Sequence, residues 1–150
     1  MKNDDETPEI PAEIRPETPI DEAMKIARES PSEGSFFYDA FLNSDLFMPV
    51  QIADQDSGTG RTVGWDEKFF PMFLKYGDVR VVSLFDRLER LNEWAGAKTP
   101  DYLLLRCHVL LKTISPGVGA VLNLGTPWVH YFSPDLVERL RQSIKNVTPA

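Results

Sequence analysis

The residue types that most often perform nucleophilic catalysis are scarce in this chain, and their spacing favours no reaction. Cys107 and His108 are adjacent. Neighbouring residues of a helix or strand point in different directions, whereas a nucleophile and its base must lie within hydrogen-bonding reach. We therefore interpret Cys107 as a small buried thiol that is chemically inert, beside a partly exposed histidine.

Two patterns resemble metal sites without completing one. Cys107, His108 and His130 are zinc-ligand types, but the local C-x2-C or H-x3-H pairing of zinc sites is missing. The segment from Asp54 begins as a calcium loop does, yet Trp65 stands where the bidentate glutamate of such a loop is required. We expect neither a metal nor another cofactor.

Charged residues between 87 and 93 also fail to indicate an acid–base pair. Glu89 and Glu93 are one helical turn apart, with Arg87 and Arg90 nearby, which is typical of a solvated helix face. The sequence contains no Gly-x-Ser-x-Gly nucleophile motif. An enzyme is therefore the least favoured reading of the chain.

Binding residues are easier to nominate than catalytic ones. The glycine-containing segment 58–64 matches neither the dinucleotide fingerprint nor the Walker loop, but it can form an adaptable binding loop. In that loop Arg61 offers an anion contact and Trp65 an apolar anchor, while Trp128 follows a Gly-Thr-Pro turn and is expected on a surface loop. The candidate binding residues are Arg61, Trp65, Asn123, Trp128 and Tyr131.

Charge is distributed unevenly along the chain. Residues 1–34 hold ten acids and four bases, whereas residues 35–150 hold thirteen acids and twelve bases. A nearly neutral body lacks the basic footprint that nucleic acid requires, so we expect no nucleic-acid partner. No apolar run is long enough to cross a membrane, the N-terminus lacks a signal-peptide pattern, and one cysteine suits a reducing compartment. We expect no membrane partner and a cytoplasmic location.

The elements that must position these residues follow from the apolar periodicity and from Pro/Gly punctuation. Thr18, Pro19 and Asp21 occupy cap, first and third positions of a short amphipathic helix. Pro49 cannot donate to a ladder and predicts an edge strand or a bulge. We expect strands at 46–52, 69–74, 79–82, 102–105 and 118–124, a hairpin turn at 76–78, a helical turn or two at 109–114, and helices at 20–30, 32–43, 84–95 and 134–144.

These elements predict an α+β fold with a single domain, in which a small mixed sheet of about four or five short strands is flanked by helices. The predicted organisation is an acidic, Pro-rich arm (1–19), a short helix and linker (20–34), the folded domain (35–145) and a tail (146–150).

Four blocks of the body resemble the N-terminal domain of the SseB-like family (enhanced serine sensitivity protein B). They are FYDAFLNSDLFMPV (37–50), FFPMF (69–73), PDYLLLRCHVLL (100–111) and GVGAVLNLGTPWVHYFSPDLVERL (117–140). Many members have a Phe-Thr-Ser turn where this chain runs 73–78 into a strand-like segment, and many carry a second domain that these residues do not include. The resemblance implies an α+β cytoplasmic bacterial protein without established catalytic residues.

Three functions remain open at this stage. The first is a non-enzymatic interaction or regulatory domain that recognises another protein, or a second copy of itself, through an apolar surface. The second is a sensor for a small molecule such as an amino-acid-like metabolite, for which Asn123 and Arg61 are the guesses at polar contacts. The third is an enzyme of unrecognised type.

Overall fold

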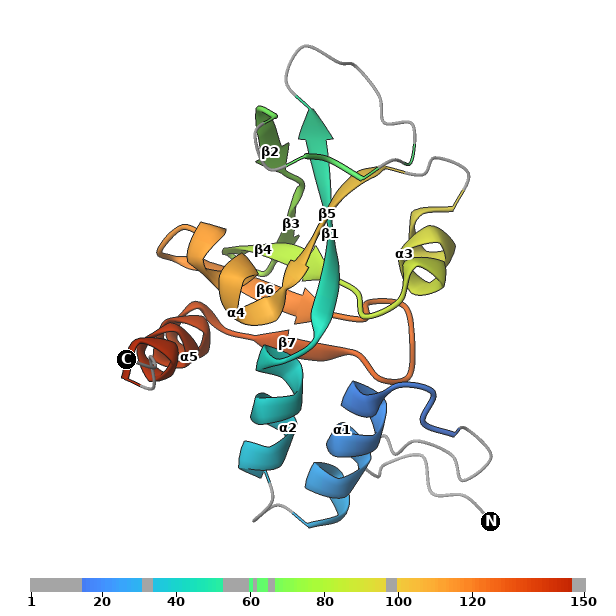
Figure 1. Cartoon of the computed structure of the whole chain (residues 1–150), viewed down its shortest axis with the longest axis vertical. Coiled ribbons are helices and arrows are strands. Elements are labelled where there is room, and N and C mark those ends of the chain that lie inside the picture. The colour runs from blue at the N-terminus through green and yellow to red at the C-terminus, as the bar shows by residue number, and fades with distance from the viewer. Residues whose placement is uncertain are drawn as a thin grey trace.

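A computed structural model describes residues 15–30, 34–52, 60, 62–64, 67–96 and 100–146. Their strands are β1 (Asp45–Ile52), β2 (Phe69–Pro71), β3 (Phe73–Tyr76), β4 (Val79–Leu84), β5 (Asp101–Arg106), β6 (Val118–Leu122) and β7 (His130–Phe132). They form a three-stranded sheet of order β2-β1-β5 and a four-stranded sheet of order β3-β4-β6-β7 (Figure 1). Among these described strands only β4 and β6 pair in parallel, and Thr62 forms an isolated parallel bridge with Tyr102.

The helices are α1 (Pro19–Glu29), α2 (Gly34–Leu42), α3 (Leu88–Ala95), α4 (Cys107–Leu110) and α5 (Pro134–Asn146), with a 3-10 turn at Leu111–Thr113. Thr18 caps α1 by accepting a hydrogen bond from the Asp21 amide, and Ser133 caps α5 by accepting from Leu136. Gly96 ends α3 with a φ of 74°, a conformation that favours glycine. The predicted α+β class is confirmed. The predicted arm (1–19) and tail (146–150) lie largely outside the described residues.

The two sheets meet at one pair of residues. Phe47 of β1 and Phe85, which follows β4, exchange two backbone hydrogen bonds of 2.8 and 2.9 Å. Beyond this junction β1 and β4 diverge. The chain at 69–76 runs between them, so β2 pairs with β1 and β3 pairs with β4. The prediction of one strand over 69–74 is wrong, because Met72 separates two strands that belong to different sheets.

Pro49 lies in the central strand of its sheet and pairs in continuous register with β5, whereas an edge strand or a bulge was predicted. Its carbonyl accepts a hydrogen bond from the Met72 amide at 3.2 Å, so its backbone faces the side on which β4 diverges. β2 pairs with β1 only from Val50 onward, and the ladder to β4 ends at Phe47. Position 49 lies between the bridge at Phe47 and the first pairing with β2. A proline is therefore tolerated there, because its missing N–H breaks no hydrogen bond between strands. Short strands such as β2 and β7 also explain why seven strands form where four or five were expected.

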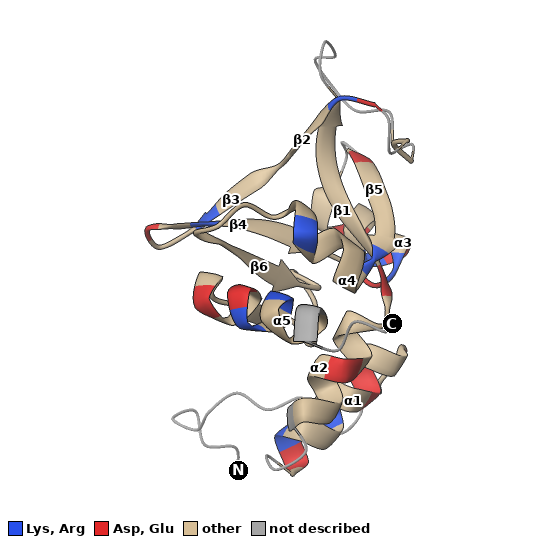
Figure 2. Ribbon diagram, turned by 60° about the vertical axis from the view of Figure 1, so that its left-hand side comes forward, with Lys and Arg blue, Asp and Glu red and all other residues tan. Residues whose placement is uncertain are grey.

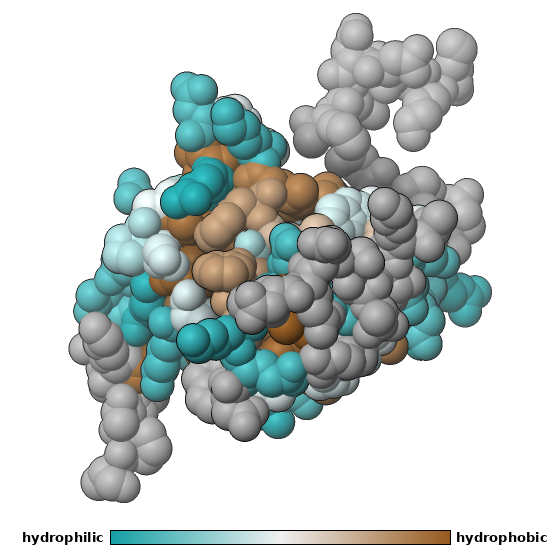
Figure 3. All heavy atoms as spheres, turned by 90° about the horizontal axis from the view of Figure 1, so that it is seen from above, coloured by the Kyte–Doolittle hydropathy of each residue, from teal (hydrophilic) through white to brown (hydrophobic). Residues whose placement is uncertain are grey.

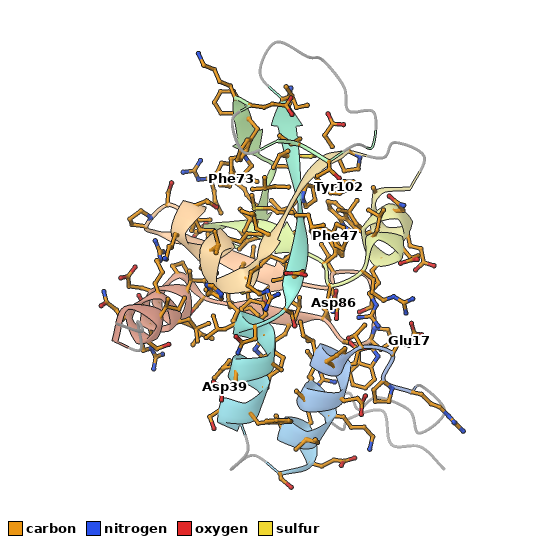
Figure 4. The ribbon with its side chains drawn as sticks, in the orientation of Figure 1. Glu17, Asp39, Phe47, Phe73, Asp86 and Tyr102 are labelled. Atoms are coloured by element: carbon orange, nitrogen blue, oxygen red, sulfur yellow. The ribbon has the colours of Figure 1, made fainter. Side chains whose placement is uncertain are left out.

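Helices cover both faces of the sheets unequally. α1, α2, α4 and α5 contribute to one large apolar core, and α1 and α2 lie side by side at one end of the molecule (Figure 1). In that core Phe41 stacks on Phe132 with 4.4 Å between ring centroids. On the opposite face, Phe47 and Tyr102 lie edge to face at 5.3 Å and pack with α3 (Figure 4).

His130 is the titratable group most closely associated with the core aromatics. Its ring lies edge-on to Phe37 and Phe132, with centroid distances of 5.1 and 4.7 Å. Burial, assisted by the positive charge of Arg28, lowers the pKa of His130. The neutral imidazole is thus favoured in the folded protein.

A depressed histidine pKa stabilises the fold above the unfolded-state pKa of about 6.5 and loses that contribution as the pH falls toward the folded-state pKa. We expect His130→Phe and His130→Gln to lose less stability than the wild type between about pH 7 and pH 5. Urea unfolding at several pH values measures how steeply the free energy of unfolding of each protein falls as the pH is lowered. Equal slopes in all three proteins would show that His130 does not contribute.

Candidate functional site

Among the described residues the cysteine is buried, and no metal-binding cluster forms. Cys107 is fully buried, and burial raises the pKa of its thiol far above the ordinary range, so the thiolate is strongly disfavoured. The predicted burial of Cys107 is confirmed. Within the described part of the chain, no group of three His, Cys, Asp or Glu side chains is placed to hold a metal ion.

The structure does not gather the five predicted binding residues into one site. Arg61 and Trp65 lie outside the described residues. Asn123 is fully buried, with a φ of 54°, and its side-chain oxygen accepts from the Asp86 amide at 3.2 Å. Trp128 was expected on a surface loop, but only 2% of it is exposed because it packs into the large core. Tyr131 alone of the three described residues is partly exposed.

Tyr131 meets a tyrosine from the other edge of its sheet. The rings of Tyr131 in β7 and Tyr76 in β3 are stacked, with centroids 4.2 Å apart. Since β4 and β6 lie between those strands, both rings must extend over the central strands. Gly119 of β6 leaves no space for a side chain, because a Cβ at this position would lie 2.6 Å from the Phe132 carbonyl oxygen and 3.3 Å from Val81. Val81, its partner in the register, is only 2% exposed.

The segment 70–76 carries the densest group of exposed apolar side chains among the described residues. We call it the β2–β3 edge and define it by its four exposed side chains. These are Phe70 (63% exposed), Met72 (37%), Phe73 (40%) and Tyr76 (57%). Seen from above, apolar side chains gather at the surface and are bordered by hydrophilic ones (Figure 3).

Sequence reasoning missed this edge because its residues looked like core. The run FFPMFLKY lacks the alternation of a half-buried strand, and the sequence predicts a single strand over 69–74. Only the proline in the run hinted at a break. The divergence of β1 from β4 leaves this apolar segment at two strand edges, and that divergence has no local sequence signal.

Three exposed cations lie along the β2–β3 edge, and none has an acidic partner among the described residues. They are Lys68, Lys75 and Arg80. The Arg80 guanidinium carbon lies 4.6 Å from the centroid of the Phe73 ring, a cation–π contact. Basic residues are visible on β3 and β4 near their connecting turn, where Asp78 supplies one acid (Figure 2).

A buried ion network joins α1 to α3 at the opposite end of the molecule. The Arg90 guanidinium donates to both carboxylate oxygens of Asp21, one of them at 2.9 Å, and to Asp86 at 3.0 Å. The Thr18 hydroxyl donates to the second oxygen of Asp86. The side chains of Arg90, Asp21 and Asp86 are 8%, 0% and 4% exposed. The expectation that Arg90 belongs to a solvated face is therefore wrong.

Two opposing effects act on this network. Burial raises the pKa of Asp86, against the Thr18 hydrogen bond and the Arg90 charge, which lower it. The hydrogen bond to Asp21 raises the pKa of Arg90, so its charge is retained despite burial. Around the network, Glu17 and Asp86 lie near the start of α1, whereas Phe73 lies on the far side of the sheets (Figure 4).

Comparison with known families matches residues 20–139 to the SseB protein N-terminal domain. The chain belongs to the SseB family. The match begins at Ile20, the first buried residue of α1. The predicted family is thereby confirmed, while no curated protein and no solved structure matches this SseB domain. Among its described helices, none combines the length and apolar character needed to span a bilayer.

The SseB domain also has a surface pocket of about 340 Å³ beside the ion network. It is lined by Glu17, Arg87, Glu89, Arg90, Glu93 and residues 125–128. Arg87 already pairs with Glu17 at 3.1 Å, and Arg90 is held by two buried carboxylates. Both arginines at this pocket are thus occupied by the protein itself, so it is a weaker candidate site than the β2–β3 edge.

We expect Arg90→Met to destabilise the SseB domain by about 3–5 kcal/mol, because it leaves two buried carboxylates without their cation. Arg87→Met is the matched control. Its side chain is 41% exposed and its partners are more exposed, so the loss should not exceed about 1 kcal/mol. Urea unfolding measures both, and hydrogen exchange should show α1 losing protection only in Arg90→Met. Equal losses in the two variants would contradict the assignment.

Proposed function

We propose that this SseB domain is a non-enzymatic protein-interaction domain that binds its partner at the β2–β3 edge. The observation that carries the proposal is the exposure of Phe70, Met72, Phe73 and Tyr76 within seven positions. Aromatic and methionine side chains are enriched at the centres of protein interfaces, where they bury much area at little entropic cost. A regulatory role in the cytoplasm belongs to the same proposal.

The position of these side chains supports binding more than packing within the chain. Aromatic residues that stabilise the core are almost completely buried. Phe41 and Phe132, for example, are each 1% exposed or less. Phe70 instead leaves 63% of its surface accessible, and Tyr76 leaves 57%. Water contact with that much aromatic surface is unfavourable, and a partner that covers it gains the corresponding free energy.

The test compares two double variants that remove similar exposed apolar surface from opposite ends of the domain. Phe70→Ser with Phe73→Ser changes the edge, whereas Ile26→Ser with Phe36→Ser changes α1 and α2, where the side chains are 40% and 51% exposed. Both should keep a cooperative thermal transition, since none of the four side chains is buried.

We expect affinity capture from cytosol to recover the same partner with the wild type and the helix variant. The edge variant should bind that partner at least about thirty-fold more weakly, as the loss of an interface hot spot does. Titration with the purified partner measures the ratio. Undiminished binding by the edge variant, or recovery of no specific partner by any of the proteins, would overturn the proposal.

A further inference from the structure

The pairing of β4 with its neighbours shows which backbone N–H and C=O groups of β3 face β4 and which face outward, where a partner could bind. Phe85 exchanges hydrogen bonds with Phe47 on one side of β4, whereas the Leu84 carbonyl accepts from Asn123 on the other side. Backbone groups alternate along a strand, so Val81 and Val79 face the same side as Phe85, which is the side of β3. Their partners in the register are Leu74 and Tyr76.

The backbone groups of Phe73 and Lys75 therefore point away from β4. β3 is the first strand of its sheet, and no described strand pairs with its outer side. An edge of this kind presents unpaired N–H and C=O groups, which are a template for an additional strand. The side chains alternate as well, so an added strand would contact Phe73 on one face of the sheet and Tyr76 on the other.

Charge decides which kind of strand fits. Lys75 lies in the middle of the exposed edge, with Arg80 opposite it in the register and Lys68 near the start of β2. Pairing β3 with β3 of a second copy would bring these cations together, and an exposed lysine on an edge strand discourages such pairing. A strand with acidic residues would neutralise them. The acidic excess of the chain as a whole makes this basic edge distinctive.

We propose that the outer edge of β3 accepts an extended partner segment that alternates acidic and apolar residues, and that this segment adds a fifth strand to the four-stranded sheet. The inference rests on the proposed function and specifies the chemistry and binding mode of the same edge. Main-chain hydrogen bonds to Phe73 and Lys75 supply pairing. On one face of the sheet Tyr76 holds the apolar residues of the segment, and on the other face Lys75 and Arg80, beside Phe73, select its acids.

Fluorescence anisotropy with synthetic peptides tests the inference on the full chain. The probes are a nine-residue peptide that alternates glutamate and valine, a counterpart that alternates lysine and valine, and the acidic peptide with a central proline. We expect the acidic peptide to bind at least about tenfold more tightly than either of the others, and more weakly as salt is added. Equal binding of the acidic and basic peptides, or full binding of the proline peptide, would overturn the inference.

Three variants of one residue separate charge from backbone pairing. Lys75→Gln removes the charge and keeps the outward amide, Lys75→Glu reverses the charge, and Lys75→Pro removes the amide that faces away from β4. Proline is tolerated at such a position, and an unchanged melting temperature would verify the fold. We expect Lys75→Glu to prefer the basic peptide, and Lys75→Pro to bind the acidic peptide at least about tenfold more weakly than Lys75→Gln does.

The outcomes distinguish this inference from the proposed function. If Lys75→Pro and Lys75→Gln bind equally while the Phe70/Phe73 variant still loses the captured partner, strand addition is wrong and the interaction domain stands. Should Lys75→Pro fail to fold, the proline-containing peptide still tests backbone pairing. Sedimentation of the protein alone tests whether a second copy of the chain, rather than a partner segment, occupies the outer edge of β3. A dimer that Lys75→Glu dissociates would make a second copy the occupant of β3 and overturn the inference.

Discussion

The pairing of Phe47 with Phe85 is the constraint on which the rest of this structure depends. It is the point at which two small sheets become one framework, because β1 and the residue directly after β4 exchange hydrogen bonds there, and β1 and β4 are not paired elsewhere. Beyond it the strands diverge, and the segment 69–76 divides between them. The position of β2 and β3, and therefore the exposure of their aromatic side chains, follows from this single pair.

The junction also explains why helices cover one side of the domain while the end that carries β2 and β3 is exposed. Helices α1, α2, α4 and α5 fill one side of the framework with a continuous core, and the Arg90 network holds α1 against the turn that follows β4. The end that carries β2 and β3 receives no comparable cover among the described elements. A rigid, well-packed side thus supports an exposed edge, which is the usual arrangement when a stable scaffold presents a binding surface.

The sequence predicted those features of the fold that depend on local chemistry. Residue types alone predicted four local features, because capping and positive φ depend on only a few neighbouring residues. These are the helix caps at Thr18 and Ser133, the end of a helix at Gly96 and the hairpin turn at Gly77. The sequence also predicted the family and the burial of Cys107. Features set by distant contacts were mispredicted or missed.

Arg90 shows why features that depend on distant contacts cannot be predicted from local sequence patterns. Its helix looks like a charged surface helix, and its partner Asp21 looks like an ordinary first-turn acid. Only the contact between segments 69 positions apart converts both into buried groups. Trp128 was misplaced for the same reason, since a loop position gives no sign that the loop folds inward. The candidate site itself, at 70–76, depended on the divergence of two strands and could not be read from residue order.

The order in which strands meet has a consequence for synthesis of the protein. β1 pairs along its length with β5, from Asp45 opposite Arg106 to Val50 opposite Asp101, and β4 needs β6, its parallel neighbour. Pairings between distant segments close long loops and form slowly. On the ribosome, therefore, the three-stranded sheet cannot be completed until the chain has emerged past β5, and the four-stranded sheet cannot be completed until it has emerged past β7. Until then the apolar run at 69–76 can pair only with β1 and β4, while the strands that complete both sheets have yet to emerge, so the growing chain exposes more apolar surface than the folded domain does.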